Sequence, residues 1–368
     1  MDIRSLIAPV VTDREALQDF VDTLADHAAH VERDVAMLKS TPGDRHVISE
    51  LFRAVHNIKG DAALCKIELA VAIAHPIETV LSRFRDGEIA FSDFLAEAIL
   101  LAIDRLELAA EALVTGKSLD ALRLLPLVQG LEKLALAAPA DLDARASDLI
   151  EAVSGFRPAA SVSIPTRGKT SSAASSKNPR VADDLHFFRS LAAQFEARSP
   201  LFKGRTTRIL RLAQETNLAA GKRIDPAQLE AAVCMHDVGM MFLPESVWLK
   251  VDHMTPDEKL ILRTHPDYAA GLLARMDGWG AAAEMVAQHH EMPDGAGYPK
   301  GLKADQICDG AKILAIVDAF EAVMLKHIHR GKNRSVLRAI AEINACDKQF
   351  APEWIEPFNR VIRRTVEA

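Results

Sequence analysis

The sequence carries a helical pattern of apolar residues almost throughout, and this pattern restricts the chain to an all-α fold. Apolar residues recur at i, i+3 and i+4, β-branched residues rarely cluster, and no alternating pair of strands is found. Breaks such as Asp86-Gly87 and Thr115-Gly116 are typical of turns between antiparallel helices, so the N-terminal part predicts a helix bundle. The predicted helices cover residues 13–39, 46–62, 67–86, 91–115, 120–137, 141–153, 183–197, 202–217, 226–237, 256–275, 279–290, 310–327 and 333–345.

One stretch interrupts the helical pattern and divides the chain. Residues 157–180 read RPAASVSIPTRGKTSSAASSKNPR, with no acidic residue, much Ser, Ala and Pro, and almost nothing to bury. This composition indicates a flexible tether; a basic contact surface is the alternative. A chain of 368 residues is long enough for two domains. We therefore predict a bundle over 1–137, a short helix and linker over 138–182, and a second all-α domain over 183–368.

Composition and charge argue against several classes of partner. A formal net charge of −7 does not suit a nucleic-acid polymer or an anionic membrane, although it is compatible with a small anionic ligand. The four cysteines form no CxxC pair, which argues against a disulfide framework and a thiolate zinc site. Acidic residues interrupt the most apolar stretch, and the N-terminus lacks a secretory signal, so we expect no membrane insertion and a cytoplasmic location. The interrupting residues are Glu97, Asp104, Glu107 and Glu111.

A polar stripe lies on one face of the predicted helix that begins near residue 46. His56, Lys59, Gly60 and Ala63 are spaced at i, i+3, i+4 and i+7. An exposed imidazole beside an ammonium group and a glycine suits phosphoryl transfer, because the nitrogen can attack and the lysine offsets phosphate charge. An ordinary surface histidine is the alternative. The residues expected to face the core are Leu51, Val55 and Ile58.

Residues 10–135 resemble the histidine-phosphotransfer (HPt) domain, especially the form found in chemotaxis-type kinases. The resemblance rests on His56-x-x-Lys59-Gly60, on a second helix with His75-x-x-Glu78, and on its end at residues 85–88, RDGE. It implies that His56 is phosphorylated, that Lys59 neighbours the phosphate and that Glu78 orients the imidazole. Without a Gly-rich ATP site, the phosphate should come from a histidine kinase or a response regulator.

The bundle sequence departs from these relatives at two places. Asp61 stands where they commonly have Gly or Ser, and Cys65 to Glu68 lacks a typical Phe-Gly-Phe turn. Both departures bear on the choice of partner more than on phosphorylation.

The C-terminal part is dominated by residues 289–299, HHEMPDGAGYP, in which two histidines and an acid precede a bendable loop. Imidazoles and carboxylates without thiolates suit Fe, Mn or Zn, and a bridging carboxylate suits two ions about 3.5 to 4 Å apart. Taken singly, His265-Pro266 is compatible with a helix cap and Asp318 with a satisfied core acid. The candidate ligands together are His236, Asp237, His265, His289, His290 and Asp318.

Residues 183–368 resemble the HD-GYP subgroup of the HD phosphohydrolases. The match is HHExxDGxGYP, supported by His236-Asp237, His265-Pro266 and Asp318. The resemblance implies an all-α domain that binds divalent metal ions, commonly iron or manganese, and hydrolyses cyclic di-GMP. It also implies that the loop contacts partner proteins. The ligands would be the six residues listed above, and the substrate loop would comprise Asp294, Gly295, Gly297, Tyr298 and Pro299.

Two residues depart from the HD-GYP pattern. Residues 196–209, EARSPLFKGRTTRI, place Arg205 where the first metal-binding histidine belongs, and Met240 stands where a phosphate-contacting lysine is expected. A guanidinium has no lone pair for a metal, so one metal position should be weakened or lost. Either Arg205 replaces that ion as a fixed charge beside a single metal, or the domain is catalytically impaired.

The sequence therefore predicts a bacterial signalling protein in which phosphorelay through His56 is coupled to a metal-dependent cyclic di-GMP phosphodiesterase with one or two ions. The alternative is a phosphorelay protein whose second domain only binds a nucleotide or a partner. Hydrolysis of another phosphate ester is a third possibility. Whether the chain forms a homodimer stays open.

Overall fold

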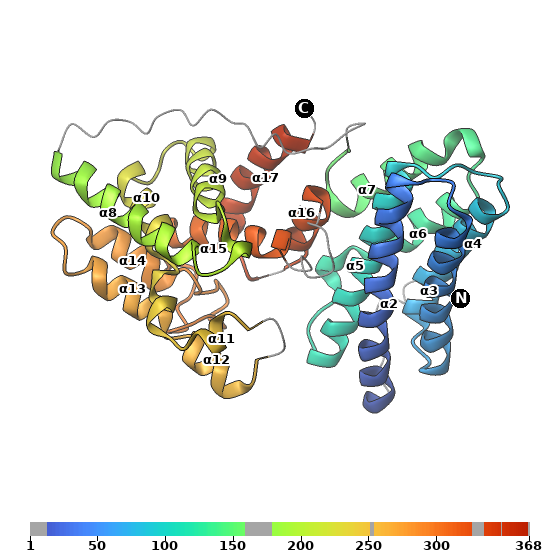
Figure 1. Cartoon of the computed structure of the whole chain (residues 1–368), viewed down its shortest axis with the longest axis horizontal. Helices are drawn as coiled ribbons and strands as arrows, with labels where there is room; N and C mark the ends of the chain where they lie inside the picture. Colours follow the sequence, from blue (N-terminus) through green and yellow to red (C-terminus); the bar gives the residue numbers. More distant parts are fainter. Residues whose placement is uncertain (1–12, 159–178, 251–253, 326–334, 347, 367–368) are drawn as a thin grey trace. The chain divides into compact units, whose positions relative to one another are not determined.

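The computed structural model describes residues 13–158, 179–250, 254–325, 335–346 and 348–366, and these residues are helical without any strand (Figure 1). Most of the predicted linker, residues 159–178, lies outside the described residues. No described helix is both long and apolar enough to cross a membrane. Contacts between elements divide the chain into two compact units, the first with α2 to α7 and α16, the second with α8 to α15 and α17.

The first unit is a helix bundle. Asp13 caps α2 by accepting a hydrogen bond from the Ala16 amide, and Gly87 and Gly116 adopt positive φ after α4 and α5, as expected for turn glycines. In Figure 1, α3 lies alongside α2 and α4, while α5 packs against α2 and α7. The helices are α2 (Arg14–Ser40), α3 (Arg45–Leu64), α4 (Glu68–Arg85), α5 (Asp93–Thr115), α6 (Leu124–Ala135), α7 (Leu142–Ser154) and α16 (Val336–Ala345).

In the second unit, α10 and α15 pack against several other helices. α10 contacts α8, α9 and α14, and α15 packs against α9 and α14. This arrangement brings the ends of several helices to one place, which is where the candidate metal ligands lie. The helices are α8 (Pro179–Glu196), α9 (Arg205–Ala219), α10 (Pro226–Met235), α11 (Glu245–Trp248), α12 (Pro256–Leu262), α13 (His265–Leu273), α14 (Gly280–Gln288), α15 (Asp309–Leu325) and α17 (Pro352–Val366).

Turns divide two of the predicted helices. The predicted helix over 120–137 is divided because Arg123 adopts a left-handed conformation between a 3₁₀ turn and α6. The predicted helix over 256–275 is divided into α12 and α13, whose Pro266 lies in the first turn. The 3₁₀ helices are η1 (Asp120–Leu122), η2 (Pro139–Asp141), η3 (Pro200–Phe202) and η4 (Val238–Phe242).

The predicted ranges omit α17. Pro352 and Pro357 obscure its helical pattern, although proline is tolerated in a first turn. The apolar spacing was nevertheless present, because the buried residues recur at helical intervals. These residues are Trp354, Phe358, Val361 and Ile362.

Candidate functional site

The first candidate site lies on the exposed faces of α3 and α4. The side chain of His56 is 57% exposed, and its Nδ1 lies 2.6 Å from Glu78 Oε1. Lys59 Nζ donates a hydrogen bond to the other carboxylate oxygen of Glu78. The core-facing residues of α3 are fully buried, as their spacing predicts: Leu51, Val55 and Ile58.

Glu78 is held in its ionised form. Burial raises the pKa of its carboxyl, but the hydrogen bonds and charges of Lys59 and His56 outweigh burial, so the pKa of Glu78 lies below its ordinary value. An ionised carboxylate accepts the Nδ1 proton of His56 and leaves the lone pair on Nε2 for attack on phosphorus. This arrangement can support nucleophilic phosphoryl transfer.

The neighbourhood of His56 adds groups that the sequence did not single out. The Phe52 ring stacks on His56 with centroids 6.1 Å apart, and the Arg85 guanidinium lies 4.4 Å from the Phe52 ring centroid. At Gly60, an added Cβ would meet no atom within 4 Å, so the fold of this chain does not itself require glycine there. Asp61, the departure noted above, pairs with His27 at 3.2 Å.

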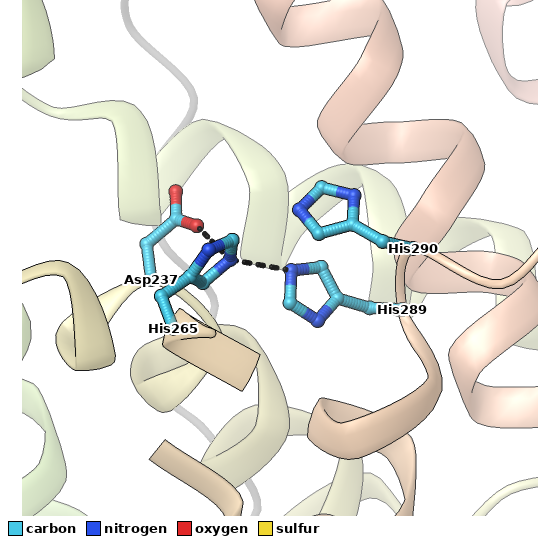
Figure 2. Close-up of side chains that lie close together, drawn as sticks. All are labelled: Asp237, His265, His289 and His290. Carbon is cyan, nitrogen blue, oxygen red and sulfur yellow. Dashed lines mark hydrogen bonds and ion pairs between the residues drawn. The ribbon is translucent and has the colours of Figure 1, made fainter. Parts of the chain in front are cut away.

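The second candidate site is a cluster of imidazoles and carboxylates at helix ends in the second unit. His236 and Asp237 follow α10, His265 begins α13, His289 and His290 follow α14, and Asp318 lies within α15. Figure 2 shows Asp237 and three of the rings turned toward one another. Two groups have ligand atoms within 4.8 Å of one another: Asp237, His265, His289 and His290, and His236, Asp237 and Asp318.

Backbone carbonyls orient three of the histidine rings. Nδ1 of His236, His265 and His289 lies 2.8, 2.7 and 2.6 Å from the carbonyl oxygen three residues earlier. An Nδ1–H that donates to a carbonyl leaves Nε2 as the lone-pair atom, which is the usual arrangement in metal sites. His265 Nε2 accordingly lies 3.5 Å from Asp237 Oδ1 and 3.4 Å from His289 Nε2.

Burial favours the neutral form of three rings, because it lowers the pKa of His265, His289 and His290. It is the main cause that lowers the pKa of His289 well below its ordinary value and that of His290 to about 4, and neighbouring imidazoles add to it. A neutral ring is the form that binds a metal. The donor set and its orientation therefore fit a divalent ion.

Arg205 occupies the other part of the cluster. Its Nη1 donates to Asp237 and its Nη2 to Asp318, so one guanidinium bridges both carboxylates of the second group. Burial raises the pKa of the Asp237 carboxyl, but His236 and Arg205 outweigh burial and hold this pKa well below its ordinary value. Glu196 fixes the start of α9 by accepting hydrogen bonds from the Gly204 and Thr206 amides, at 2.7 and 2.6 Å.

Two family models match the chain. Residues 15–111 match the Hpt domain, and residues 189–353 match the HD domain. The chain joins an Hpt domain to an HD domain. We therefore refer to the first unit as the Hpt unit and to the second as the HD unit.

The curated relatives match less than half of this chain and less than half of their own length. A cyclic di-GMP phosphodiesterase of Thermotoga maritima is 29% identical over 151 residues, 40% of this chain and 40% of that protein. A cyclic di-GMP phosphodiesterase response regulator of Xanthomonas campestris is 36% identical over 98 residues, 26% of each chain. A 3'3'-cGAMP-specific phosphodiesterase of Vibrio cholerae is 32% identical over 147 residues, 38% of this chain and 28% of that protein.

The GYP loop, residues 294–299, lies against the histidine cluster. The Tyr298 ring stacks on His290 with centroids 4.7 Å apart, and the Arg263 guanidinium lies 5.1 Å from the Tyr298 ring centroid. Gly297 is required by space, because an added Cβ would lie 2.3 Å from the Met292 nitrogen. Gly295 has φ +84°, and Pro299 follows a cis peptide bond.

Two acids shape this loop. Glu291 is buried and accepts hydrogen bonds from the Lys300 and Leu302 amides at 2.7 and 2.8 Å. Asp294 accepts from the Ala296 amide at 2.9 Å, within the turn itself. The sequence motif contained Glu291 without indicating this role.

Met240 adds no charge to the HD unit. It packs against an apolar cluster of Phe195, Leu243 and Trp248. Two arginines place positive charge near the cluster instead. Arg205 lies beside Asp237, and Arg263 lies over the Tyr298 ring.

Gly239→Ala should destabilise the HD unit and displace His265. An added Cβ at Gly239 would lie 2.0 Å from the His265 carbonyl oxygen, so backbone must move. Overpacking of this kind costs about 1–3 kcal/mol, which corresponds to a loss of roughly 3–10 °C in Tm. Differential scanning calorimetry measures this change.

Gly271→Ala is the matched control, because an added Cβ there meets no atom within 4 Å. We expect its Tm to equal or exceed that of the wild-type protein, since alanine favours a helix. Equal Tm values for both variants would contradict the close approach at Gly239.

Proposed function

We propose that this chain is a bacterial two-component signalling protein in which phosphorelay through His56 is coupled to a metal-dependent cyclic di-GMP phosphodiesterase. The observation that carries the hydrolase part is the cluster of Asp237, His265, His289 and His290 beside the GYP loop. The relatives that are named as cyclic dinucleotide phosphodiesterases support the substrate class. We place the protein in the cytoplasm, where cyclic di-GMP and two-component partners would be met.

In the phosphorelay step, His56 Nε2 attacks the phosphorus of a phosphorylated histidine kinase or response regulator. The new P–N bond forms as the bond to the donor residue breaks, and the electron pair leaves with the donor. Glu78 holds the Nδ1 proton, and Lys59 offsets the charge of the phosphoryl group. The exposed face of α3 and α4 admits such a partner.

In the HD unit we propose one iron or manganese ion held by Asp237, His265, His289 and His290. Such an ion supplies Lewis-acid chemistry, which polarises a phosphoryl oxygen and makes water a stronger nucleophile. Arg205 provides a permanent positive charge beside this position, in the place of a second ion. Tyr298 and Arg263 would hold the cyclic dinucleotide over the cluster, and Glu291 fixes the loop that carries Tyr298.

A catalytically impaired binding module is the second candidate function. Two observations favour it: Arg205 already neutralises Asp237 and Asp318, and Met240 packs among apolar side chains where a phosphate-binding cation is expected. Such a domain would keep the GYP loop as a surface for a nucleotide or a signalling partner. Measurement of cyclic di-GMP hydrolysis by the metal-loaded, full-length chain separates the two candidates.

His56→Gln should abolish phosphoryl labelling of the chain. Glutamine keeps a polar side chain but has no nucleophilic nitrogen, so incubation with a phosphorylated response regulator or an active histidine kinase should leave no acid-labile label. The measurement is ³²P incorporation after separation from the donor protein.

His75→Gln is the matched control for this experiment. His75 is also exposed, and its Nδ1 lies 3.8 Å from Glu78. Its label should stay within about twofold of the wild-type level, because His75 lies beyond hydrogen-bond distance of the carboxylate. Label that survives in His56→Gln, or that is lost in His75→Gln alone, would overturn the assignment.

A further inference from the structure

Helix α5 carries charged residues on a buried face, where the helices of a bundle normally have apolar side chains. Glu97, Asp104 and Arg105 are 8%, 3% and 1% exposed. Glu97 and Asp104 are seven residues apart and therefore share one stripe of the helix. Buried charges are stable only when other groups compensate them, so this stripe requires a charged or polar partner.

The partner is α16, which packs against α5, α7 and η1. Arg338 donates from Nε and Nη2 to both carboxylate oxygens of Asp104 at 2.6 Å, and Nη2 also donates to Glu32 of α2 at 2.6 Å. Arg105 donates to the Ala341 carbonyl oxygen at 2.6 Å, and the Ser335 hydroxyl donates to Glu97.

The contacts follow the same order along both helices, so α16 runs in the same direction as α5. Ser335, Arg338 and Ala341 meet residues 97, 104 and 105 in that order. A bidentate arginine at the centre adds geometric specificity to the attraction of charge, which a solvated surface pair does not provide. The charged stripe of α5 is therefore a receptor matched to one helix.

The same helix belongs, by sequence, to the HD part of the chain. Residues 336–345 lie within the stretch that matches the HD domain model, between α15 and α17 of the HD unit. α17 is firmly held there: Phe358 packs on Phe320 of α15, and Lys312 of α15 pairs with Glu353 at 3.0 Å.

The connection from α16 to α17 is short. Residues 346–351 separate Ala345 from Pro352 and span at most about 25 Å even when fully extended. While α16 is bound to α5, this length limits the distance between Ala345 and the start of α17 at Pro352. The Ser/Ala/Pro stretch around residues 159–178 permits a much larger separation.

We propose that α16 is a docking helix that couples the HD unit to the Hpt unit, with the charged stripe of α5 as its receptor. The HD part of the sequence thereby contributes a structural element to the Hpt unit. A change in the Hpt unit reaches α17 through residues 346–351, and α15 through the packing of Phe358 on Phe320. α15 carries Asp318, which pairs with Arg205 in the candidate metal site. The proposal rests on the hydrogen bonds and ion pairs between α16 and the bundle, and it stands whether or not the HD unit is catalytic.

Arg338→Met in the full-length chain tests the docking. Methionine fills similar space but leaves Asp104 and Glu32 without their shared cation, so α16 should detach. Loss of one partner of a buried pair corresponds to about a 100-fold or greater increase in the opening equilibrium. Hydrogen–deuterium exchange should therefore be at least about 100-fold faster in α16 and faster in α5, with α10, α13 and α14 unchanged.

Small-angle X-ray scattering of the same variant tests the coupling. Detachment should increase the maximum dimension of the molecule, because only the longer linker then restrains the two units. Arg145→Met is the matched control, since Arg145 forms a solvent-exposed pair with Asp148 on α7, and it should change neither measurement. If Arg338→Met fails to fold, Asp104→Asn weakens the same pair with less loss of volume.

The outcomes separate the parts of the proposal. Unchanged exchange in α16 and α5 would overturn the docking. Faster exchange with an unchanged scattering curve would overturn the coupling. Neither result depends on phosphorylation or hydrolysis, so failure here is distinguishable from failure of the proposed function.

Discussion

Arg205→His is expected to raise the divalent metal bound by the chain from about one ion to about two. In the wild-type protein, the Arg205 guanidinium bridges Asp237 and Asp318, and a protonated guanidinium cannot donate to a metal. A histidine at this position removes the competing charge and supplies a lone pair beside His236, Asp237 and Asp318. These three residues already have ligand atoms within 4.8 Å of one another.

Metal content after Mn²⁺ or anaerobic Fe²⁺ loading and desalting, measured by inductively coupled plasma mass spectrometry, tests this prediction. Thermal stability gives a second readout. Without metal, the variant leaves the buried Asp237 and the half-buried Asp318 with less compensating charge, so it should unfold at a lower temperature than the wild type; loading with metal should restore its Tm.

Arg211→His, on the exposed face of the same helix, is the control and should bind as much metal as the wild type. Two ions in the wild-type chain would show that Arg205 does not replace one. An unchanged count in Arg205→His would place the second group of ligands outside any metal site.

Asp237→Asn should weaken metal binding by at least about 100-fold. Asp237 belongs to both groups of candidate ligands, and the substitution removes its negative charge with little change of shape. Replacing a residue that only orients a metal ligand lowers the affinity for the metal roughly 10–100-fold. Replacing a residue that is itself a ligand should therefore lower the affinity more. Calorimetric titration with Mn²⁺ measures the change directly.

Asp267→Asn changes an exposed acid in the first turn of α13, two residues after His265, and serves as the control. Its affinity for Mn²⁺ should match that of the wild type. Equal affinity in Asp237→Asn would mean that the ligands have been assigned wrongly.

The sequence predicted the helices that have continuous apolar patterns. It did not predict features that depend on the backbone conformation of one residue or on contacts between residues far apart in the chain. α2 to α5 follow the predicted ranges closely, because turn glycines and the Asp13 cap mark their ends. Arg123 gave no sign of its left-handed conformation. The docking of α16 on α5 was not predictable, because Arg338 and Asp104 are 234 residues apart and each alone resembles a solvent-facing charge.

The candidate site shows the same division. The motif sequences named the six candidate ligands and His56, Lys59 and Glu78, and the structure brings each set together. The bridging position of Arg205 required the fold, since it depends on Glu196 fixing α9 and on Asp318 arriving from α15. Arg263 was missed because its contact with Tyr298 joins a helix end to a distant loop.

The most direct test of the account is hydrolysis of cyclic di-GMP by the full-length chain, purified anaerobically and supplied with Mn²⁺ or Fe²⁺. We predict formation of a linear dinucleotide by the wild type, and at least about a 100-fold lower rate in a His236→Ala/Asp237→Ala variant. Absence of product from a folded, metal-loaded wild-type protein would contradict the phosphodiesterase assignment and leave the HD unit as a binding module.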